Sequence, residues 1–258
     1  MNSGRFFSWV LLVACATSVH AAEPLEESVV QKYEVDPDVT LSVENTDGAI
    51  RVYGTHKKEV CIQAIKRAYD RERLQAIVVD VKASRNRIAI TTSFPPRKNV
   101  LSDRSGTVDY IIVVPQTARL NELKLTTGEI QVEGLRPGGS ASARLVNGWL
   151  GGQNCFANLD LSVDTGRLDL AYSWWENHEI AIKASSARGN IRAIFPSDAA
   201  LNLSAVAAEG KVANGFQSNK AGTAGVVHSV AEVIGSEAEA VVSLEARRGN
   251  IRIDKFNY

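Results

Sequence analysis

Three carboxylates, Asp47, Asp164 and Glu209, are the candidates for catalytic residues. Each stands one or two places before a recurring glycine. Glycosidase chemistry needs two carboxyl groups at a controlled separation, one of them with a raised pKa. If the glycines mark strands stacked about 4.8 Å apart, two such groups could lie within that range. Equivalent positions in the other copies hold a mixed polar set: Thr126, Thr127, Asn147, Arg188 and Arg248. Because no acid pair repeats, we interpret the three carboxylates as solvated turn residues and predict no catalytic residue.

Histidine and cysteine form no recognisable metal or nucleophile motif. His56, His178 and His228 lie at unrelated distances from one another and from Cys61 and Cys155. Neither a zinc-binding spacing nor a Ser-His-Asp arrangement is present, so we expect no metal and no cofactor. In an exported protein the two cysteines can pair if they lie on adjacent strands, but two buried free thiols fit the sequence at least as well.

Tyr172, Trp174 and Trp175 form the most distinctive local feature of the chain, within the segment YSWWENH. In a strand, adjacent side chains point to opposite faces, so at least one tryptophan would lie outside the core unless a loop covered it. An exposed aromatic ring can stack on a sugar or contact a protein partner. The alternative is a packed corner where the chain turns between strands. We take these three residues as a candidate contact surface.

A recurring sequence motif predicts the strands that hold or flank these residues. It consists of a polar pair, a glycine, any residue, an aliphatic, any residue and a second aliphatic. Its turn glycines are Gly48, Gly128, Gly148, Gly166, Gly189, Gly210 and Gly249. Glycine adopts positive φ at no steric cost, which favours a tight turn before each strand. An aliphatic residue stands two places after every one of these glycines, and apolar alternation predicts strands with one face in a core.

The glycines recur at intervals near 20 residues, a period typical of one coil of a solenoid. We therefore predict an all-β fold, a single-stack right-handed β-solenoid of about ten coils. The same template fits around Asn86 and Gly106, and the 39-residue gap before Gly249 would hold about two units. An antiparallel sandwich with glycine turns is the alternative.

The first residues, 1–21, predict a secretory signal peptide. Arg5 precedes an apolar run that is too short to span a bilayer, and Val19 and Ala21 suit the cleavage rule. We therefore expect an exported protein, periplasmic or at the cell surface or secreted. A segment that resembles a lipobox and ends in Cys15 supports an alternative, a lipoprotein anchored through that residue.

The remaining chain divides into an acidic lead-in at residues 22–38 and a repeat domain at residues 39–258. Within the domain, residues 66–75 are charged and without glycine or β-branched residues, so we expect one short helical insertion there. Residues 94–106 hold two prolines and mixed charges, which makes them a candidate loop or boundary between subparts.

Composition argues against several classes of partner. The chain has 29 basic and 29 acidic side chains and no net charge. Binding to nucleic acid or to anionic lipid would need a clustered basic face, which the sequence does not suggest. No second apolar run approaches transmembrane length, so we expect no transmembrane segment in the mature chain.

The repeat resembles the bacterial "putative adhesin" domain family of unknown function. The resemblance rests on YIIVVP at residues 110–115, on the later segments TTGEIQVEG, VNGWLGG and DTGRLDL, and on LSVENTDGAIRVYG at residues 41–54. It covers about residues 39–256. It implies a β-solenoid displayed at or near the bacterial envelope and offers no catalytic residues to carry over. The sequence departs from the family's pattern at residues 172–178 and 199–231.

Together these features favour an exported, non-catalytic envelope protein, an adhesin-like or scaffold module that presents an extended β surface to a protein or glycan. One alternative is a carbohydrate-active β-helix enzyme, which architecture alone suggests. Another is a self-assembling envelope polymer. A stack of strands ends in unpaired backbone edges, so caps or end-to-end self-association are needed. The acidic lead-in, the helical insertion or the last residues, Lys255–Tyr258, could supply the caps.

Overall fold

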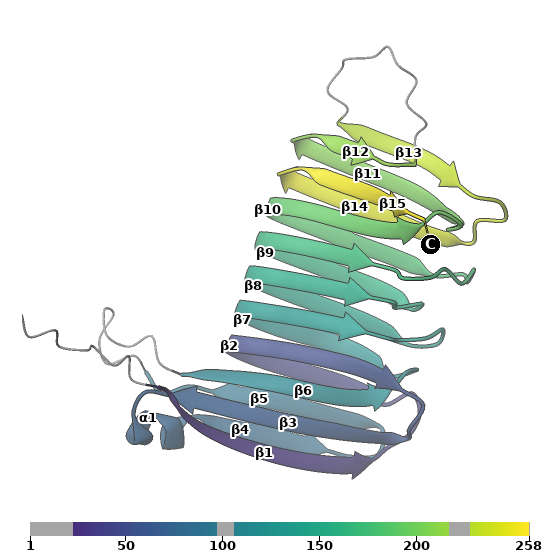
Figure 1. Ribbon diagram of the computed structural model, residues 1–258. Coiled ribbons are helices and arrows are strands. Elements are labelled where there is room, and N and C mark those ends of the chain that lie inside the picture. The colour runs from purple at the N-terminus through teal and green to yellow at the C-terminus, as the bar shows by residue number, and fades with distance from the viewer. Residues whose placement is uncertain (1–22, 97–105, 217–227, 258) are drawn as a thin grey trace, which may run out of the picture.

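The computed structural model describes residues 23–96, 106–216 and 228–257 (Figure 1). The predicted signal peptide with Cys15, and residues 97–105 of the candidate boundary, lie outside these ranges. Within the described ranges there is one helix, of 6 residues, and none is long and apolar enough to cross a membrane. The other regular elements are strands, so the predicted all-β class is confirmed.

The strands form one open sheet of 15 strands. In the long strands buried and exposed residues alternate, as expected where one face of a sheet is covered. In chain order the elements are β1 (Leu25–Glu34), β2 (Thr40–Thr55), β3 (Glu59–Ala68), α1 (Arg71–Ala76), β4 (Val78–Ala83), β5 (Arg87–Ser93), β6 (Thr107–Pro115), β7 (Arg119–Glu133), β8 (Ser140–Gln153), β9 (Asn158–Ala171), β10 (Ala181–Pro196), β11 (Leu201–Glu209), β12 (Val212–Asn214), β13 (Ser229–Ile234), β14 (Ala240–Arg248) and β15 (Ile251–Phe256).

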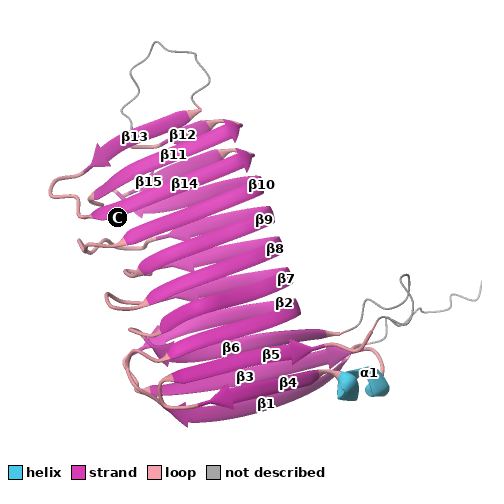
Figure 2. Cartoon of the chain, turned by 180° about the vertical axis from the view of Figure 1, so that it is seen from behind, coloured by secondary structure: helices cyan, strands magenta, loops and turns pink. Residues whose placement is uncertain are grey.

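The middle of the sheet is a parallel stack. Strands β2, β7, β8, β9 and β10 lie side by side in that order and pair in parallel. Each bends near its glycine, so its first part lies in one layer and its second part in the other (Figures 1 and 2). Side chains from both parts, such as Leu125 and Ile130 of β7, are buried in one hydrophobic core. The two layers therefore share a single interior.

The glycines at these bends stack directly on one another. In spatial order this glycine column runs through Gly48, Gly128, Gly148, Gly166, Gly189, Gly249 and Gly210. All of them except Gly210 have positive φ, from 125° to 147°. A Cβ on Gly148 would lie 1.9 Å from the carbonyl oxygen of Gly128, and every other member would meet a backbone oxygen within 2.2 Å. Glycine is therefore needed for close approach between strands as well as for the bend.

The final strands do not lie at the end of the stack. Strands β14 and β15, which flank Gly249, lie between β10 and the earlier strands β11 and β12. Strand β13 falls in the gap before Gly249 and pairs antiparallel with β11. In the described residues of that gap, the expectation of about two repeat units is therefore wrong. Because β15 pairs with both β10 and β12, the segment that begins at Lys255 cannot cap the stack.

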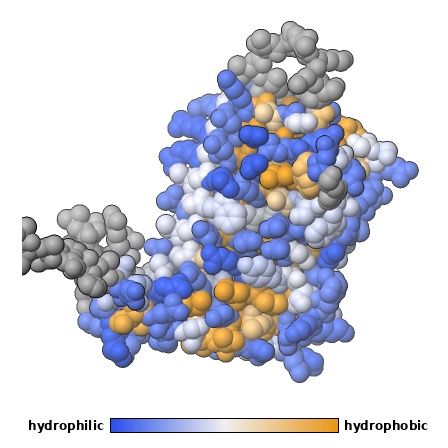
Figure 3. All heavy atoms as spheres, viewed as in Figure 1, coloured by the Kyte–Doolittle hydropathy of each residue, from blue (hydrophilic) through white to orange (hydrophobic). Residues whose placement is uncertain are grey.

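At the other end the strands reverse direction. Strands β5 and β6 pair in parallel with the two parts of β2, but β4 and β3 run antiparallel to them, and β1 runs antiparallel to β3. Asn86 lies in the tight turn between β4 and β5, so assigning it to a coil of the repeat is wrong. Much of the acidic lead-in forms β1. Apolar side chains gather at this end of the molecule (Figure 3). The sheet thus has mixed strand orientations and is not one uniform stack.

The predicted helical insertion is present but shorter and later than expected. Helix α1 begins at Arg71, whereas residues 66–68 extend strand β3 and bury Ala68. Asp70 is the N-cap, and its Oδ1 accepts a hydrogen bond from the Arg73 backbone N–H at 2.7 Å. Burial in the sheet therefore outweighs helix propensity at the start of the predicted segment.

Gly148→Ala should destabilise the protein strongly, because a collision with the Gly128 carbonyl would add to the strain of a φ of 139°. We expect urea denaturation to show a loss of more than about 3 kcal/mol in the free energy of unfolding. Gly138→Ala is the matched control, since its φ is 93° but the nearest atom to a new Cβ is Thr117 Cγ2 at 3.9 Å. It should cost only about 1–2 kcal/mol. Equal losses in the two variants would contradict a role for close approach.

Candidate functional site

The candidate contact residues lie in the connection between β9 and β10, residues 172–180, rather than in a strand. This connection is longer than those between β7 and β8, residues 134–139, and between β8 and β9, residues 154–157. All three connections lie at the same edge of the stack (Figure 1). The alternation rule for strands therefore does not decide where the two tryptophans point.

Tyr172 is buried, with 1% of its surface exposed. Its ring stacks on Phe195 at 5.5 Å, and its hydroxyl donates a hydrogen bond to the Cys155 carbonyl at 2.8 Å. Burial raises the pKa of Tyr172 well above its ordinary value. Trp175 packs edge-on against both rings, at 5.4 Å from Tyr172 and 5.9 Å from Phe195. The packed corner is thus the right description of these two residues, and Tyr172 offers no surface to a ligand.

Trp174 behaves differently, since 39% of its surface is exposed. Its Nε1 donates a hydrogen bond to Glu176 Oε1 at 2.7 Å. The other carboxylate oxygen of Glu176 accepts from Arg136 Nη1 at 2.5 Å and lies 3.2 Å from His178 Nε2. The Arg136 guanidinium lies 5.4 Å from the Phe156 ring centre and 6.0 Å from that of Trp174. We call these five residues the Trp174 corner.

The charge at the centre of the Trp174 corner is fixed by its neighbours. The hydrogen bond from Arg136, opposed by partial burial and reinforced by those from Trp174 and His178, lowers the pKa of Glu176 to about 2. Glu176 is therefore ionised throughout the physiological range and acts as a hydrogen-bond acceptor. It holds the indole and the guanidinium in one arrangement before any ligand arrives.

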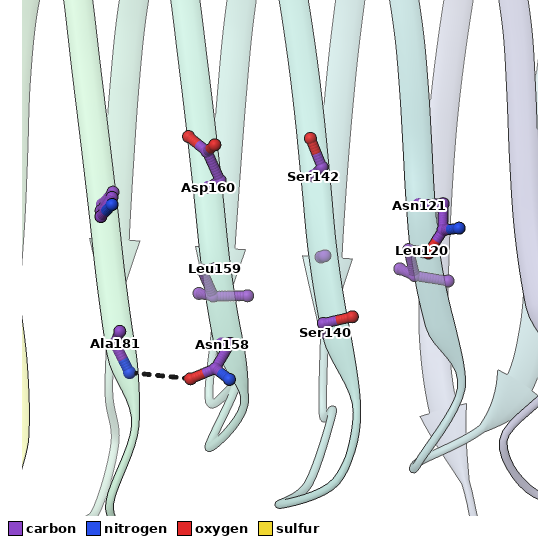
Figure 4. A pocket seen from close by; sticks show the side chains of 10 residues that line it. Leu120, Asn121, Ser140, Ser142, Asn158, Leu159, Asp160 and Ala181 are labelled. Atoms are coloured by element: carbon purple, nitrogen blue, oxygen red, sulfur yellow. Dashed lines mark hydrogen bonds between the residues drawn. The ribbon is translucent and has the colours of Figure 1, made fainter.

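A second feature lies on the outer face of the first layer. A shallow hollow of about 310 Å³ crosses strands β7 to β10, and polar and apolar residues from neighbouring strands line it (Figure 4). Asn121, Ser142, Asp160 and Lys183 contribute side chains to it. Asn158 Oδ1 accepts a hydrogen bond from the Ala181 backbone N–H at 2.9 Å. The hollow offers donors and acceptors on a flat sheet and has no enclosed chamber.

The three carboxylates singled out in the sequence do not come together. Asp47 and Glu209 lie at opposite ends of one in-register row, and Asp164 stands one place before that row in β9. The intervening members of the row are Thr127, Asn147, Thr165, Arg188 and Arg248. Glu209 forms an ion pair with Arg248 at 3.2 Å. This arrangement separates the carboxylates instead of pairing them.

The cysteines and histidines likewise remain apart. Cys61 and Cys155 are free thiols, and burial raises the pKa of Cys155 to about 11. His178 belongs to the Trp174 corner. Over the described ranges, no group of three or more His, Cys, Asp and Glu side chains is placed to hold a metal ion.

Sequence reasoning did not find Arg136, Phe156 or Glu176 as part of this site. Arg136 and Glu176 are 40 residues apart and follow no motif. The usable signal is the repeat period, because turns one period apart fall at the same edge of a parallel stack. It places the three connections together but does not say which side chains meet.

No family model and no curated protein matches this chain. Among solved structures, a "putative cell adhesion protein" from Clostridium sporogenes is similar over 91% of this chain and 100% of its own, with 15% identity and a TM-score of 0.54. A "putative adhesin" from Bacteroides fragilis aligns over 88% of this chain and 97% of its own, with 15% identity and a TM-score of only 0.34. The first likeness shows a shared fold.

Glu176→Gln should lower stability at neutral pH but not at low pH. Because the folded protein lowers the pKa of Glu176 from 4.5 to about 2, the stability it contributes is present above pH 4.5 and lost as pH falls towards 2. The side chain is 35% exposed, so we expect the difference at pH 7 to be below about 1 kcal/mol. Urea denaturation of both proteins between pH 7 and pH 2 measures it, with the exposed Glu179→Gln as control. A difference that stays constant with pH would contradict this account.

Proposed function

We propose that this protein is an exported, non-catalytic envelope module of the adhesin-like kind, a β-solenoid scaffold that presents a contact surface to a glycan or a protein. The observation that carries the proposal is the exposed Trp174 ring, which Glu176 and Arg136 fix at the edge of the stack. The fold shared with a protein named for cell adhesion supports it.

A glycan suits the Trp174 corner better than an extended peptide does. A sugar ring has an apolar face that stacks on an indole and a rim of hydroxyls that need hydrogen-bond partners. Trp174 supplies the ring, and the guanidinium of Arg136 and the carboxylate of Glu176 stand beside it. Because these groups are already held in place, binding would lose little side-chain entropy.

The chemistry of the acidic groups supports binding without turnover. A glycosidase needs a carboxylic acid with a raised pKa beside a second carboxylate. Glu176 has its pKa lowered instead, and the row that holds Asp47 and Glu209 keeps them at opposite ends. Neither Glu176 nor the row that holds Asp47 and Glu209 therefore supplies the carboxylate pair that a carbohydrate-active enzyme needs.

Export belongs to the same proposal. The signal peptide at residues 1–21 would release a chain that starts at Ala22, whereas a lipid on Cys15 would keep the protein on a membrane. The intact mass of the protein recovered from its native cells distinguishes the two forms. A mass that retains residues 1–21 in a cytoplasmic fraction would contradict export.

Trp174→Ala should abolish most binding without unfolding the protein. A panel of envelope polysaccharides, tested by equilibrium binding and for release of new reducing ends, should give at least one ligand and no release. We expect the variant to weaken that binding by about 10-fold or more while the urea midpoint changes little. Val146→Ala, which trims an exposed apolar side chain (43%) on β8, is the matched control.

Two results would contradict the proposal. Unchanged affinity in Trp174→Ala would remove the Trp174 corner as the contact site. New reducing ends whose release stops in Asp164→Asn or Glu209→Gln would support the enzyme alternative.

Trp175→Ala is expected to lower stability instead, because its ring packs between Tyr172 and Phe195.

A further inference from the structure

Strand β1 leaves one long backbone edge without a partner. It pairs with β3 along all 10 of its residues, and the described strands place nothing on its other side. In an antiparallel strand, alternate residues point their N–H and C=O groups away from a given neighbour. An edge of this length is a template for another strand unless it is protected. Charges, proline or a bulge commonly protect such edges; β1 contains neither proline nor a bulge, and its charged residues are Glu26, Glu27, Lys32 and Glu34.

The surface of this edge is also apolar at its centre. Val29 is 44% exposed and Val30 is 56% exposed, one on each face of the strand. On the inner face a hollow of about 230 Å³ reaches the core residues Ile62 and Ala64 and is bordered by Val29 and Val79. The core of the stack is therefore incompletely covered at this end.

We propose that β1 pairs antiparallel with β1 of a second copy of this chain, on a two-fold axis through Val29. A two-fold axis perpendicular to the sheet places the side chain of any given residue on the same face in both copies. Side chains directly opposite each other in an antiparallel pair also lie on one face. Only registers that place a residue opposite itself satisfy both conditions. With Val29 opposite Val29, Glu26 lies opposite Lys32 of the partner copy, and Leu25 lies opposite Tyr33. Each of these two contacts occurs twice.

The neighbouring symmetric registers fit worse. With Val30 opposite Val30, Glu26 would face Glu34 of the other copy, and like charges directly opposite are destabilising. With Ser28 opposite Ser28, Glu26 would face Val30 and Leu25 would face Gln31, without any opposite-charge pair. Only the Val29 register joins apolar with apolar residues and acidic with basic ones.

The opposite end of the stack does not offer the same match. Its edge strand β13, residues 229–234, has 6 residues and a single charged side chain, Glu232. Glu232 already accepts a hydrogen bond from Asn214 at 2.7 Å. Self-pairing of β13 brings no opposite charges together. Pairing through β1 alone uses one surface on both copies, so it gives a closed dimer and not a filament. This inference is independent of the display function proposed above.

A charge-swap series tests the register. The purified protein, in the processed form recovered from cells, should be a dimer at micromolar concentration in sedimentation equilibrium. Glu26→Lys and Lys32→Glu each replace two attractive cross-strand pairs by two repulsive ones, so each should raise the dimer Kd by about 10-fold or more. The double variant E26K/K32E restores opposite charges in the same register and should return the Kd to within about 3-fold of the wild type.

The double variant separates an effect on folding from an effect on dimerisation. Glu26 also contacts Arg67 of its own chain at 2.8 Å, and that contact is lost equally in Glu26→Lys and in the double variant but kept in Lys32→Glu. Restoration in the double variant therefore cannot come from folding. Val29→Lys, which places two ammonium groups on the axis, should leave a folded monomer. Val233→Lys on β13, at a residue 65% exposed, should leave the dimer unchanged.

Three results would overturn the proposal. A strictly monomeric wild type up to millimolar concentration would dismiss pairing. A dimer that none of the β1 variants weakens would place the interface elsewhere. A double variant no tighter than the single variants would show that the Val29 register is wrong.

Discussion

The contact between successive glycines at the bends is the constraint on which the rest of this structure depends. With no Cβ in the way, the carbonyl oxygen of one glycine sits where the side chain of the next would be, as Gly128 does beneath Gly148. Any residue with a side chain would push the strands apart at that point. The column therefore sets the register of β2 and β7 to β10, and with it the rows of side chains on both faces of the sheet.

The Trp174 corner follows from that register. Because the parallel strands end at the same edge, the connections after β7, β8 and β9 lie next to one another. Arg136, Phe156 and Trp174 come from these three connections in turn. Ionised Glu176 then links the first and the third by hydrogen bonds. A site assembled in this way needs no local motif, only a scaffold that keeps its turns in line.

Sequence patterns predicted the features that depend on residues close together in the chain. They did not predict the features that depend on contacts between distant segments. The alternation of apolar and polar residues and the glycine motif predicted the strands, their buried face and every member of the glycine column. The same patterns say which face is buried but not which strand lies beside which, so β14 and β15 between β10 and β11, and the reversal at β3 and β4, were missed. The strand rule was applied to Trp174 and Trp175, which lie in a loop, and Tyr172 was grouped with them although packing on Phe195 buries it.

Hydrogen exchange followed by mass spectrometry on the native protein tests the central claim most directly, that a stack locked by the glycine column carries the contact residues. Amides of β7 to β10 should open only with global unfolding and exchange slowest, the connection at residues 172–180 should be intermediate, and β1 and β13 should exchange fastest in monomeric protein. Exchange in β7 to β10 as fast as in the edge strands would contradict the account, because the column would then not hold the stack together.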